Sequence, residues 1–222
     1  MIDKDTYLKL LDELGKQVEL VAVSKRQPAE RIRAVYDYGQ RIFGENYVQA
    51  LRERPDEIGR NDIRWQMIGH LQSNKVKYLS PFVDLIHGVD NFDLLQVINK
   101  EALKNHRTID CLFQIHIATE ESKFGLSFDE ARSIFESEEL KALPHIRICG
   151  LMGMATFTDD DHLVRKEFRG LRKFFEQMKH DHFQADDHFS LLSMGMTDDY
   201  RIALDEGSTM VRIGTLIFGE RD

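Results

Sequence analysis

The chain has 222 residues and a formal net charge of -8, a length at which an α/β barrel still forms one domain. The acidic balance argues against a protein whose main task is to neutralise nucleic-acid phosphates or to dock on anionic lipid, although it leaves room for a local basic pocket that binds a small anion. No run approaches the roughly 18 apolar residues that span a bilayer, and residues 1–18 lack the pattern of a secretory signal, so we expect a cytoplasmic protein.

Short apolar runs rich in β-formers alternate with helical patterns along the chain. Residues 3–16 form an extra amphipathic helix before the first run, and Pro28 suits the start of the next helix because its fixed φ matches a first turn. Eight strands alternating with helices predict a single (β/α)8 barrel over residues 1–222 rather than a doubly wound sheet. The predicted strands are 20–25, 42–45, 64–69, 85–90, 111–118, 146–155, 191–196 and 210–218.

Cysteine and histidine usage gives no reason to expect a metal. Cys111 and Cys149 each lie in an apolar run and are predicted to be small buried core residues, because two cysteines make neither a disulfide framework nor a metal quartet. Residues 180–188 carry three histidines and three aspartates. We interpret them as a solvated connection after a helix, since a catalytic zinc site needs at least three well-supported ligands.

Lys25 ends the first apolar run, Leu-Val-Ala-Val-Ser-Lys. Active sites of such barrels gather at the carboxyl ends of the strands, so a lysine there is a candidate Schiff-base nucleophile. The amine reacts when neutral, and desolvation beside Val21 and Val23 would favour that form. Taken alone, the segment fits an ordinary solvated charge at a strand end better.

The last two runs carry residues suited to binding phosphate. Gly195 and Gly214 would let the backbone approach an anion, Ser193 and Thr215 would add hydroxyl donors, and residues 197–198 could cap a helix starting near 198. Barrels often bind phosphate at these two positions. The alternative is that both glycines merely relieve crowding at strand ends.

Arg212 is predicted to alternate with Val211 and Ile213 and so to face the opposite side of the last strand. If it points into the barrel mouth it needs an acceptor, such as an unprotonated ring nitrogen. An arginine opposite a pyridine nitrogen is one way in which proteins tune pyridoxal 5′-phosphate (PLP). The alternative is an outward arginine paired with Asp205 or Glu206.

With these residues in view, the chain resembles the YggS/PROSC family of pyridoxal phosphate homeostasis proteins nearly from end to end. One departure is Gln66, where the family usually has histidine after the aromatic residue. The motifs that carry the resemblance are Val-Ala-Val-Ser-Lys25 with Pro28, Phe43-Gly-Glu-Asn46-Tyr-Val-Gln49, Trp65-Gln-Met-Ile-Gly69 with Leu71-Gln-Ser-Asn-Lys75, Gly150-Leu-Met152, Leu192-Ser-Met-Gly-Met196 with Asp198-Asp199, and Gly207-Ser-Thr-Met-Val-Arg-Ile-Gly-Thr215 followed by Phe218-Gly.

The resemblance implies a fold-type-III PLP barrel like the N-terminal domain of alanine racemase, with PLP held by Lys25 as an internal aldimine. It implies that Arg212 faces the pyridine nitrogen, that Asn46 lies near the Lys25 side of the ring and that Met152 packs nearby. The residues implied at the phosphate are Ser193, Gly195, Gly214 and Thr215.

The resemblance also bears on activity. Alanine racemases take a second acid/base, a tyrosine, from an additional β domain, whereas this chain ends at Asp222 directly after the eighth run. Arg212 at the ring nitrogen would also weaken the cofactor as an electron sink. We therefore expect a monomeric PLP carrier or homeostasis protein with little turnover, whose candidate partners are apo PLP-dependent enzymes.

Two alternatives stay open. One is a small PLP enzyme acting on amino or keto acids, with His70 or Tyr47 as the second base. The other is a barrel that binds a phosphorylated metabolite without covalent chemistry, in which Lys25 makes only an electrostatic contact.

Overall fold

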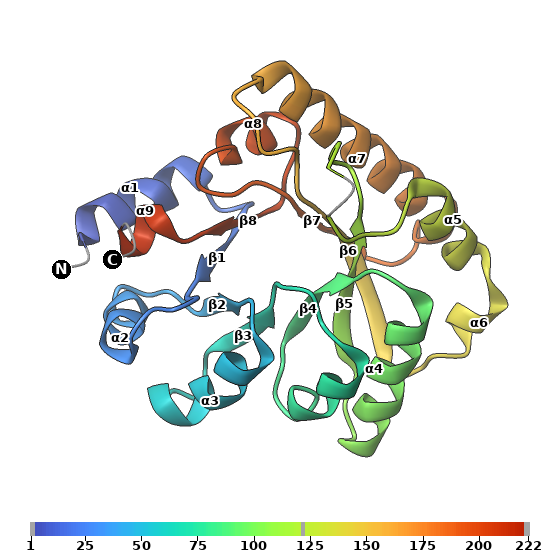
Figure 1. The fold of residues 1–222 in the computed structure, drawn as a ribbon, viewed down its shortest axis with the longest axis horizontal. Helices are drawn as coiled ribbons and strands as arrows, with labels where there is room; N and C mark the ends of the chain where they lie inside the picture. The colour runs from blue at the N-terminus through green and yellow to red at the C-terminus, as the bar shows by residue number, and fades with distance from the viewer. Residues whose placement is uncertain (1–2, 121–122, 220–222) are drawn as a thin grey trace.

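The strands of the chain close into a barrel, seen in Figure 1 for the computed structural model, which describes residues 3–120 and 123–219. Every strand runs parallel to its neighbours, each pairs with the next in sequence, and β8 closes against β1. The (β/α)8 prediction is confirmed. The strands are β1 (Glu19–Val23), β2 (Ile42–Glu45), β3 (Arg64–Met67), β4 (Leu85–Val89), β5 (Ile109–Ile115), β6 (Ile146–Gly153), β7 (Leu191–Ser193) and β8 (Met210–Ile213).

Helices surround the barrel, and the N-terminal helix packs beside the C-terminal one (Figure 1). The helices are α1 (Lys4–Leu14), α2 (Ala29–Asp37), α3 (Val48–Ile58), the 3-10 helix η1 (Ser73–Tyr78), α4 (Phe92–Lys104), α5 (Phe128–Glu136), α6 (Glu138–Lys141), α7 (Asp161–His182), α8 (Tyr200–Asp205) and α9 (Thr215–Phe218). The first is the predicted extra helix. Asp3 caps it by accepting from the Asp5 N–H, and its buried face presents Tyr7, Leu10 and Leu14.

The barrel has two apolar layers because side chains of a strand alternate between its faces. In β1, Val21 belongs to the cluster inside the barrel, whereas Leu20 and Ala22 belong to the larger layer beneath the helices. The inner cluster consists of Val21, Ile68, Leu85, Leu112, Cys149, Met152 and Met210. It fills the interior, so a ligand can reach only the mouth above it.

Several predicted strands are shorter than their apolar runs. The largest error is at 210–218, where the strand ends at Ile213 and residues 215–218 form α9. The neighbouring strand β1 ends at Val23, so a longer β8 would leave its backbone groups without partners. The strand predicted at 20–25 likewise stops before Lys25, which lies in the turn that follows.

The structure also tests the predictions for the two cysteines and for the segment 180–188. Cys111 and Cys149 are free and buried, as predicted. The segment 180–188 begins inside α7, which runs to His182, so the prediction that all of it is a connection is wrong.

Among residues 3–120 and 123–219, we find no group of three or more potential ligands placed to bind a metal ion. The same residues include no helix with the length and apolar character needed to cross a bilayer.

Candidate functional site at the mouth of the barrel

Lys25 lies in a tight turn just beyond β1. The Gln27 N–H donates to the Ser24 carbonyl over 3.0 Å, and Arg26 between them takes a left-handed φ of 60°. The lysine is partly buried, and its Nζ lies 5.5 Å from the centre of the Tyr47 ring. The amine is therefore presented at the mouth, beside the Tyr47 ring that follows β2.

A buried ion pair holds this turn in place. Glu45 at the end of β2 is 0% exposed, and its Oε1 accepts from Arg54 Nε over 2.8 Å and from Ser24 Oγ over 2.9 Å. The Nη2 atom of Arg54 donates to the carbonyls of Ser24 and Gln27, at 3.3 and 2.9 Å. The two carbonyls that bracket Lys25 are thus held by one guanidinium, which we call the Glu45–Arg54 clamp.

The clamp is costly to bury. Burial raises the pKa of Glu45 although Arg54 and Ser24 oppose that shift, and the Oε2 atom of Glu45 has no hydrogen-bond partner among the described residues. Removing Arg54 would leave a buried carboxylate unpaired. Sequence analysis missed Arg54, because its position on α3 gives no sign that it reaches back to β1.

Arg212 lies on the opposite face of β8 from Val211 and Ile213, as alternation predicted, and this face is turned into the barrel. Val211 and Ile213 pack in the outer layer, and Arg212 is 4% exposed. Its Nη1 donates to the carbonyl and hydroxyl of Ser193, at 2.9 and 2.7 Å, and its Nη2 donates to the Gly153 carbonyl at 3.2 Å. Burial lowers the pKa of Arg212 to about 10, so the guanidinium keeps its charge at neutral pH.

The alternative of an outward Arg212 is excluded by the partners of the two carboxylates. Asp205 pairs with Arg165, and Glu206 pairs with both Arg165 and Arg169 on α7. These contacts tie α7 to the end of α8 on the outside of the barrel, away from Arg212.

A chain of polar side chains continues from Arg212 across the interior. The hydroxyl of Ser193 lies 3.2 Å from His87 Nδ1, and His87 Nε2 lies 2.7 Å from Gln66 Oε1. Because Arg212 donates to the hydroxyl, the hydroxyl donates to Nδ1 and Nε2–H donates to Gln66, which defines a neutral imidazole. Burial and the charge of Arg212 lower the pKa of His87 well below 6.5, consistent with that form.

This chain, Gln66–His87–Ser193–Arg212, gives Gln66 a structural place that sequence analysis left open. His87 was missed, and a histidine within the apolar run Leu-Ile-His-Gly-Val was the only sequence sign of it. Ser193 is 0% exposed with its hydroxyl committed to Arg212 and His87. The hydroxyl thus holds the arginine, and its role at a phosphate stays a prediction.

The loop after β7 is shaped by Gly195, which has a φ of +95°. A Cβ there would lie 2.6 Å from the Ala203 Cβ, so both conformation and space require glycine. Asp199 accepts from the Met196 N–H over 2.6 Å and folds the loop back on itself. The helix predicted to start near 198 begins at Tyr200, with Asp199 rather than residues 197–198 at its N-cap.

The loop after β8 lies beside the Lys25 turn. A Cβ on Gly214 would lie 3.4 Å from both the Cβ and the carbonyl oxygen of Val23, and Gly214 is the N-cap of the short helix α9. Thr215 is the first residue of that helix and is exposed. The N–H groups of Ile217 and Phe218 both donate to the Gly214 carbonyl, at 3.0 and 2.9 Å. The N–H groups of Thr215 and Leu216, at the start of the helix, are the candidate donors to other groups at the mouth.

The remaining predicted residues are divided between the rim and the interior. Asn46 follows β2, is partly buried and lies against Gly69, where a Cβ would come within 2.4 Å of the Asn46 carbonyl oxygen. Met152 pairs in register with Ser193 and belongs to the inner apolar cluster. The structure thus brings Lys25, Asn46 and Gly214 to one rim, with Arg212 and Met152 beneath it.

The two candidate second bases are placed differently. His70 Nδ1 lies 3.0 Å from an Asp90 carboxylate oxygen, and its ring stacks on Phe124 with centroids 4.0 Å apart. The Tyr47 side chain is 52% exposed, and its ring face is turned to Lys25. His70 therefore lies at the mouth with one ring nitrogen already engaged.

Taken together, the mouth offers a partly buried amine at one side, free backbone donors beside it and a buried guanidinium in its floor. An amine can form a Schiff base with an aldehyde, and backbone donors suit an oxyanion such as phosphate. A charged guanidinium disfavours protonation of a nearby ring nitrogen. These features fit an anionic heteroaromatic aldehyde.

Comparison with known proteins agrees with this chemistry. The alanine racemase N-terminal domain family matches residues 5–222. A pyridoxal phosphate homeostasis protein of Aquifex aeolicus is 38% identical over 203 residues, covering 91% of this chain and 87% of that protein. The protein of the same description in Escherichia coli K12 is 35% identical over 211 residues, covering 93% and 87%.

Solved structures extend the comparison. PipY of Synechococcus elongatus with PLP bound superposes with a TM-score of 0.89 at 31% identity, covering 97% of this chain and 99% of that one. Alanine racemase of Clostridium difficile superposes with a TM-score of 0.76 at 14% identity, covering 98% of this chain and 60% of that one. The second likeness is one of fold alone.

Proposed function

Because the chain belongs to the YggS/PROSC family of pyridoxal phosphate homeostasis proteins, we propose that it binds PLP as a Schiff base on Lys25 and carries it without substantial turnover. PLP supplies an aldehyde for the lysine and an aromatic ring that can stabilise negative charge. The proposed recipients are apo forms of PLP-dependent enzymes, and the proposed carrier is a cytoplasmic monomer.

The juxtaposition of Lys25 and Arg212 supports this proposal most strongly. Lys25 follows β1, whose Val21 pairs in register with Arg212 on β8; the lysine lies at the rim and the arginine lies in the floor. Lys25 would hold the aldehyde carbon, and the backbone around Gly195, Gly214 and Thr215 would bind the phosphate. Arg212 would face the ring nitrogen and keep it unprotonated.

The same arrangement favours carriage over catalysis. A neutral pyridine accepts carbanion charge less well than a pyridinium, so Arg212 would weaken the group that most PLP enzymes depend on. Racemisation also needs a proton donor on each face of the ring. The rival function, a small amino-acid or keto-acid enzyme, depends on Tyr47 or His70, and His70 already shares a hydrogen bond with Asp90.

Borohydride reduction after incubation with PLP, followed by peptide mass spectrometry, tests the attachment. We expect one PLP on Lys25, and loss of both the adduct and its visible absorbance in Lys25→Ala. Lys123→Ala is a matched control, because this second lysine near the mouth instead donates to the Ala155 carbonyl at 2.6 Å. Attachment elsewhere, or an unchanged spectrum in Lys25→Ala, would contradict covalent binding.

Steady-state assays of the holoprotein with D- and L-amino acids test the absence of turnover. We expect rates no higher than those of free PLP at equal concentration. Rates clearly above free PLP, lost in Tyr47→Phe or His70→Asn, would instead establish the enzyme.

A further inference from the structure

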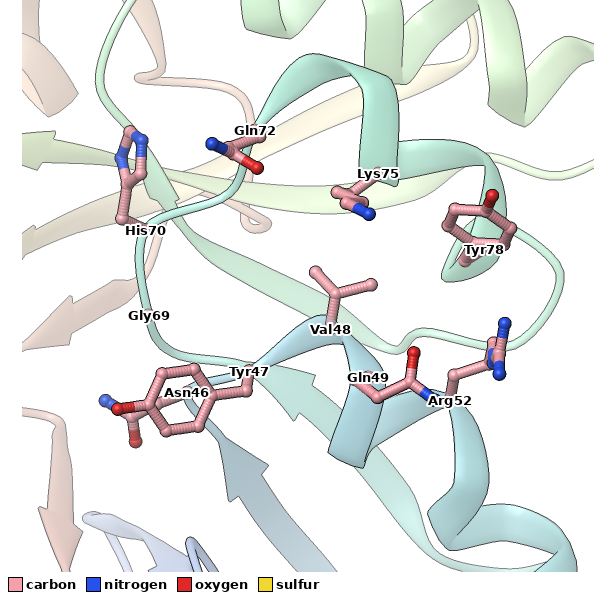
Figure 2. Close-up of a pocket in the computed structure, with 10 residues that line it drawn as sticks. All are labelled: Asn46, Tyr47, Val48, Gln49, Arg52, Gly69, His70, Gln72, Lys75 and Tyr78. Carbon is pink, nitrogen blue, oxygen red and sulfur yellow. The ribbon is translucent and has the colours of Figure 1, made fainter.

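A groove lies beside the mouth, between the first turns of α3 and the 3-10 helix η1 (Figure 2). Its volume is about 540 Å³, within the range of pockets that bind small organic molecules. Figure 2 shows Lys75 and Val48 turned into it, with Tyr47 and His70 at one end and Arg52 and Tyr78 at the other. None of these residues belongs to the clamp or to the chain that ends at Arg212.

The groove is locally basic on an acidic protein. Arg52 and Lys75 line it, and its lining contains no carboxylate. Two acids outside the lining contact it: Glu53 hydrogen-bonds Gln49 and lies 3.8 Å from an Arg52 nitrogen, a long and exposed contact, and Asp90 lies 3.0 Å from His70 Nδ1 at the other end. Lys75 takes part in no ion pair among residues 3–120 and 123–219. Two cations facing one cavity repel each other unless an anion joins them.

An aromatic ring gathers further positive charge at the far end. The Tyr78 ring has Arg52 at 5.6 Å, Lys75 at 5.8 Å and Lys77 at 5.1 Å from its centre. At the near end the Tyr47 ring is half exposed. The amides of Gln49 and Gln72 also line the cavity and add neutral donors and acceptors. The groove therefore combines anion-binding cations, aromatic rings and amides.

The groove opens onto the proposed PLP site. Asn46 and Gly69 line the groove and also belong to the rim. Tyr47 lies between the two, because it lines the groove while its ring is 5.5 Å from Lys25 Nζ. A molecule in the groove would thus be one side chain away from the proposed Schiff-base lysine.

We propose that this groove is a second, non-covalent site for a phosphorylated pyridine, which holds one B6 vitamer phosphate next to Lys25 while another is bound there. The proposal rests on the function proposed above. Arg52 and Lys75 would bind the phosphate, since a guanidinium fits two phosphate oxygens at once and an ammonium adds a point charge. Tyr78 or Tyr47 would stack on the ring.

The test uses holoprotein whose Lys25 adduct has been reduced with borohydride, so that the first site stays blocked. Pyridoxine 5′-phosphate, which has an alcohol in place of the aldehyde and cannot form a Schiff base, is titrated into it by isothermal calorimetry. We expect one further site, with a Kd raised about tenfold or more by Arg52→Gln and by Lys75→Gln. Lys141→Gln, on the distant helix α6, should leave the Kd unchanged.

Three further measurements separate the possible ligands. Tyr78→Leu should weaken binding if the ring is recognised, and inorganic phosphate should compete only weakly. Phosphate that binds as tightly as pyridoxine 5′-phosphate would overturn the assignment of a ring ligand. The visible absorbance of PLP on Lys25 should be the same in Arg52→Gln and Lys75→Gln as in the parent protein, because neither side chain belongs to the first site.

Failure of this proposal differs from failure of the first. If Lys25 takes up PLP but the reduced holoprotein binds no pyridoxine 5′-phosphate at millimolar concentration, the groove is not such a site. If Lys25 takes up no PLP, the carrier function fails, and the titration is made on Lys25→Ala. There, binding that Arg52→Gln does not weaken would overturn the groove proposal on its own.

Discussion

Lys25 follows β1 and Arg212 lies on the neighbouring strand β8, yet different kinds of interaction hold the two residues. The Lys25 turn is fastened from outside by a buried ion pair, in which Arg54 of α3 reaches over Glu45 to two backbone carbonyls. Arg212 is held from inside by neutral partners, Ser193 and, through it, His87. The comparison shows two ways of positioning a cationic side chain. At Lys25 an ion pair holds the backbone on either side of the residue, whereas at Arg212 neutral acceptors bind the charged group directly.

The clamp should be the more fragile of the two. Arg54→Met leaves the Glu45 carboxylate buried without its cation, and we expect a loss of about 3–5 kcal/mol in the free energy of unfolding. PLP uptake should slow as well, because the Ser24 and Gln27 carbonyls are released. Urea unfolding and stopped-flow absorbance measure the two effects.

Two variants sharpen the prediction for the clamp. Arg52→Met, two residues earlier on α3, changes an exposed arginine and should alter stability by no more than about 0.5 kcal/mol. Adding Glu45→Gln to Arg54→Met should recover part of the loss, because no buried charge then remains. A double variant as unstable as Arg54→Met would show that the charge is not the cause.

Among the contacts that hold Arg212, the hydrogen bonds of the Ser193 hydroxyl can be tested most directly. Ser193→Ala removes an acceptor from Arg212 and the donor to His87 Nδ1, and we expect a loss of about 1–3 kcal/mol. The matched change Ser24→Ala should cost less, about 1 kcal/mol, because Glu45 Oε1 keeps its bond to Arg54. Urea unfolding measures both losses in the free energy of unfolding. Equal losses in Ser193→Ala and Ser24→Ala would contradict the difference proposed between the Arg212 contacts and the clamp.

Lowering the pH should change the contributions of His87 and Glu45 to the free energy of unfolding in opposite directions. The pKa of His87 is lowered in the folded protein by burial and by Arg212. Below about pH 6.5 this histidine is therefore protonated in the unfolded chain and still neutral in the folded one, so the free energy of unfolding decreases as pH falls. Between pH 6.5 and 5.5 the loss from this histidine should be about 1 kcal/mol.

Glu45 works in the opposite direction. Burial raises its pKa above the ordinary 4.5, so the folded chain binds the proton first and its contribution to stability grows as pH falls toward 4.5. Unfolding free energies measured from pH 7 to 5 should accordingly fall more steeply in Glu45→Gln than in the parent protein, and less steeply in His87→Gln. Parallel curves for all three proteins would contradict this assignment of the two groups.

Much of this architecture was predictable, and the errors have a common cause. The alternation of apolar runs and helical patterns identified all eight strands, and period-two alternation put Arg212 on the opposite face of its strand from Val211 and Ile213. The ends of β1, β7 and β8 were predicted too late, at residues 25, 196 and 218 instead of 23, 193 and 213, because an apolar run continues after the neighbouring strand has ended. The run 214–218 remains apolar as α9, where Ile217 and Phe218 are buried again.

The sequence by itself determined the barrel, the strand that carries or precedes each candidate residue and the family, since these depend on local periodicity and on the order of motifs. Only the tertiary structure decided which side chains support them. Arg54 and Glu45 are nine residues apart and meet at the Lys25 turn, and His87 reaches Ser193 across 106 positions. The first contact follows from the packing of α3 on the end of β2, and the second from barrel closure, which brings distant strands together and has no counterpart in local sequence.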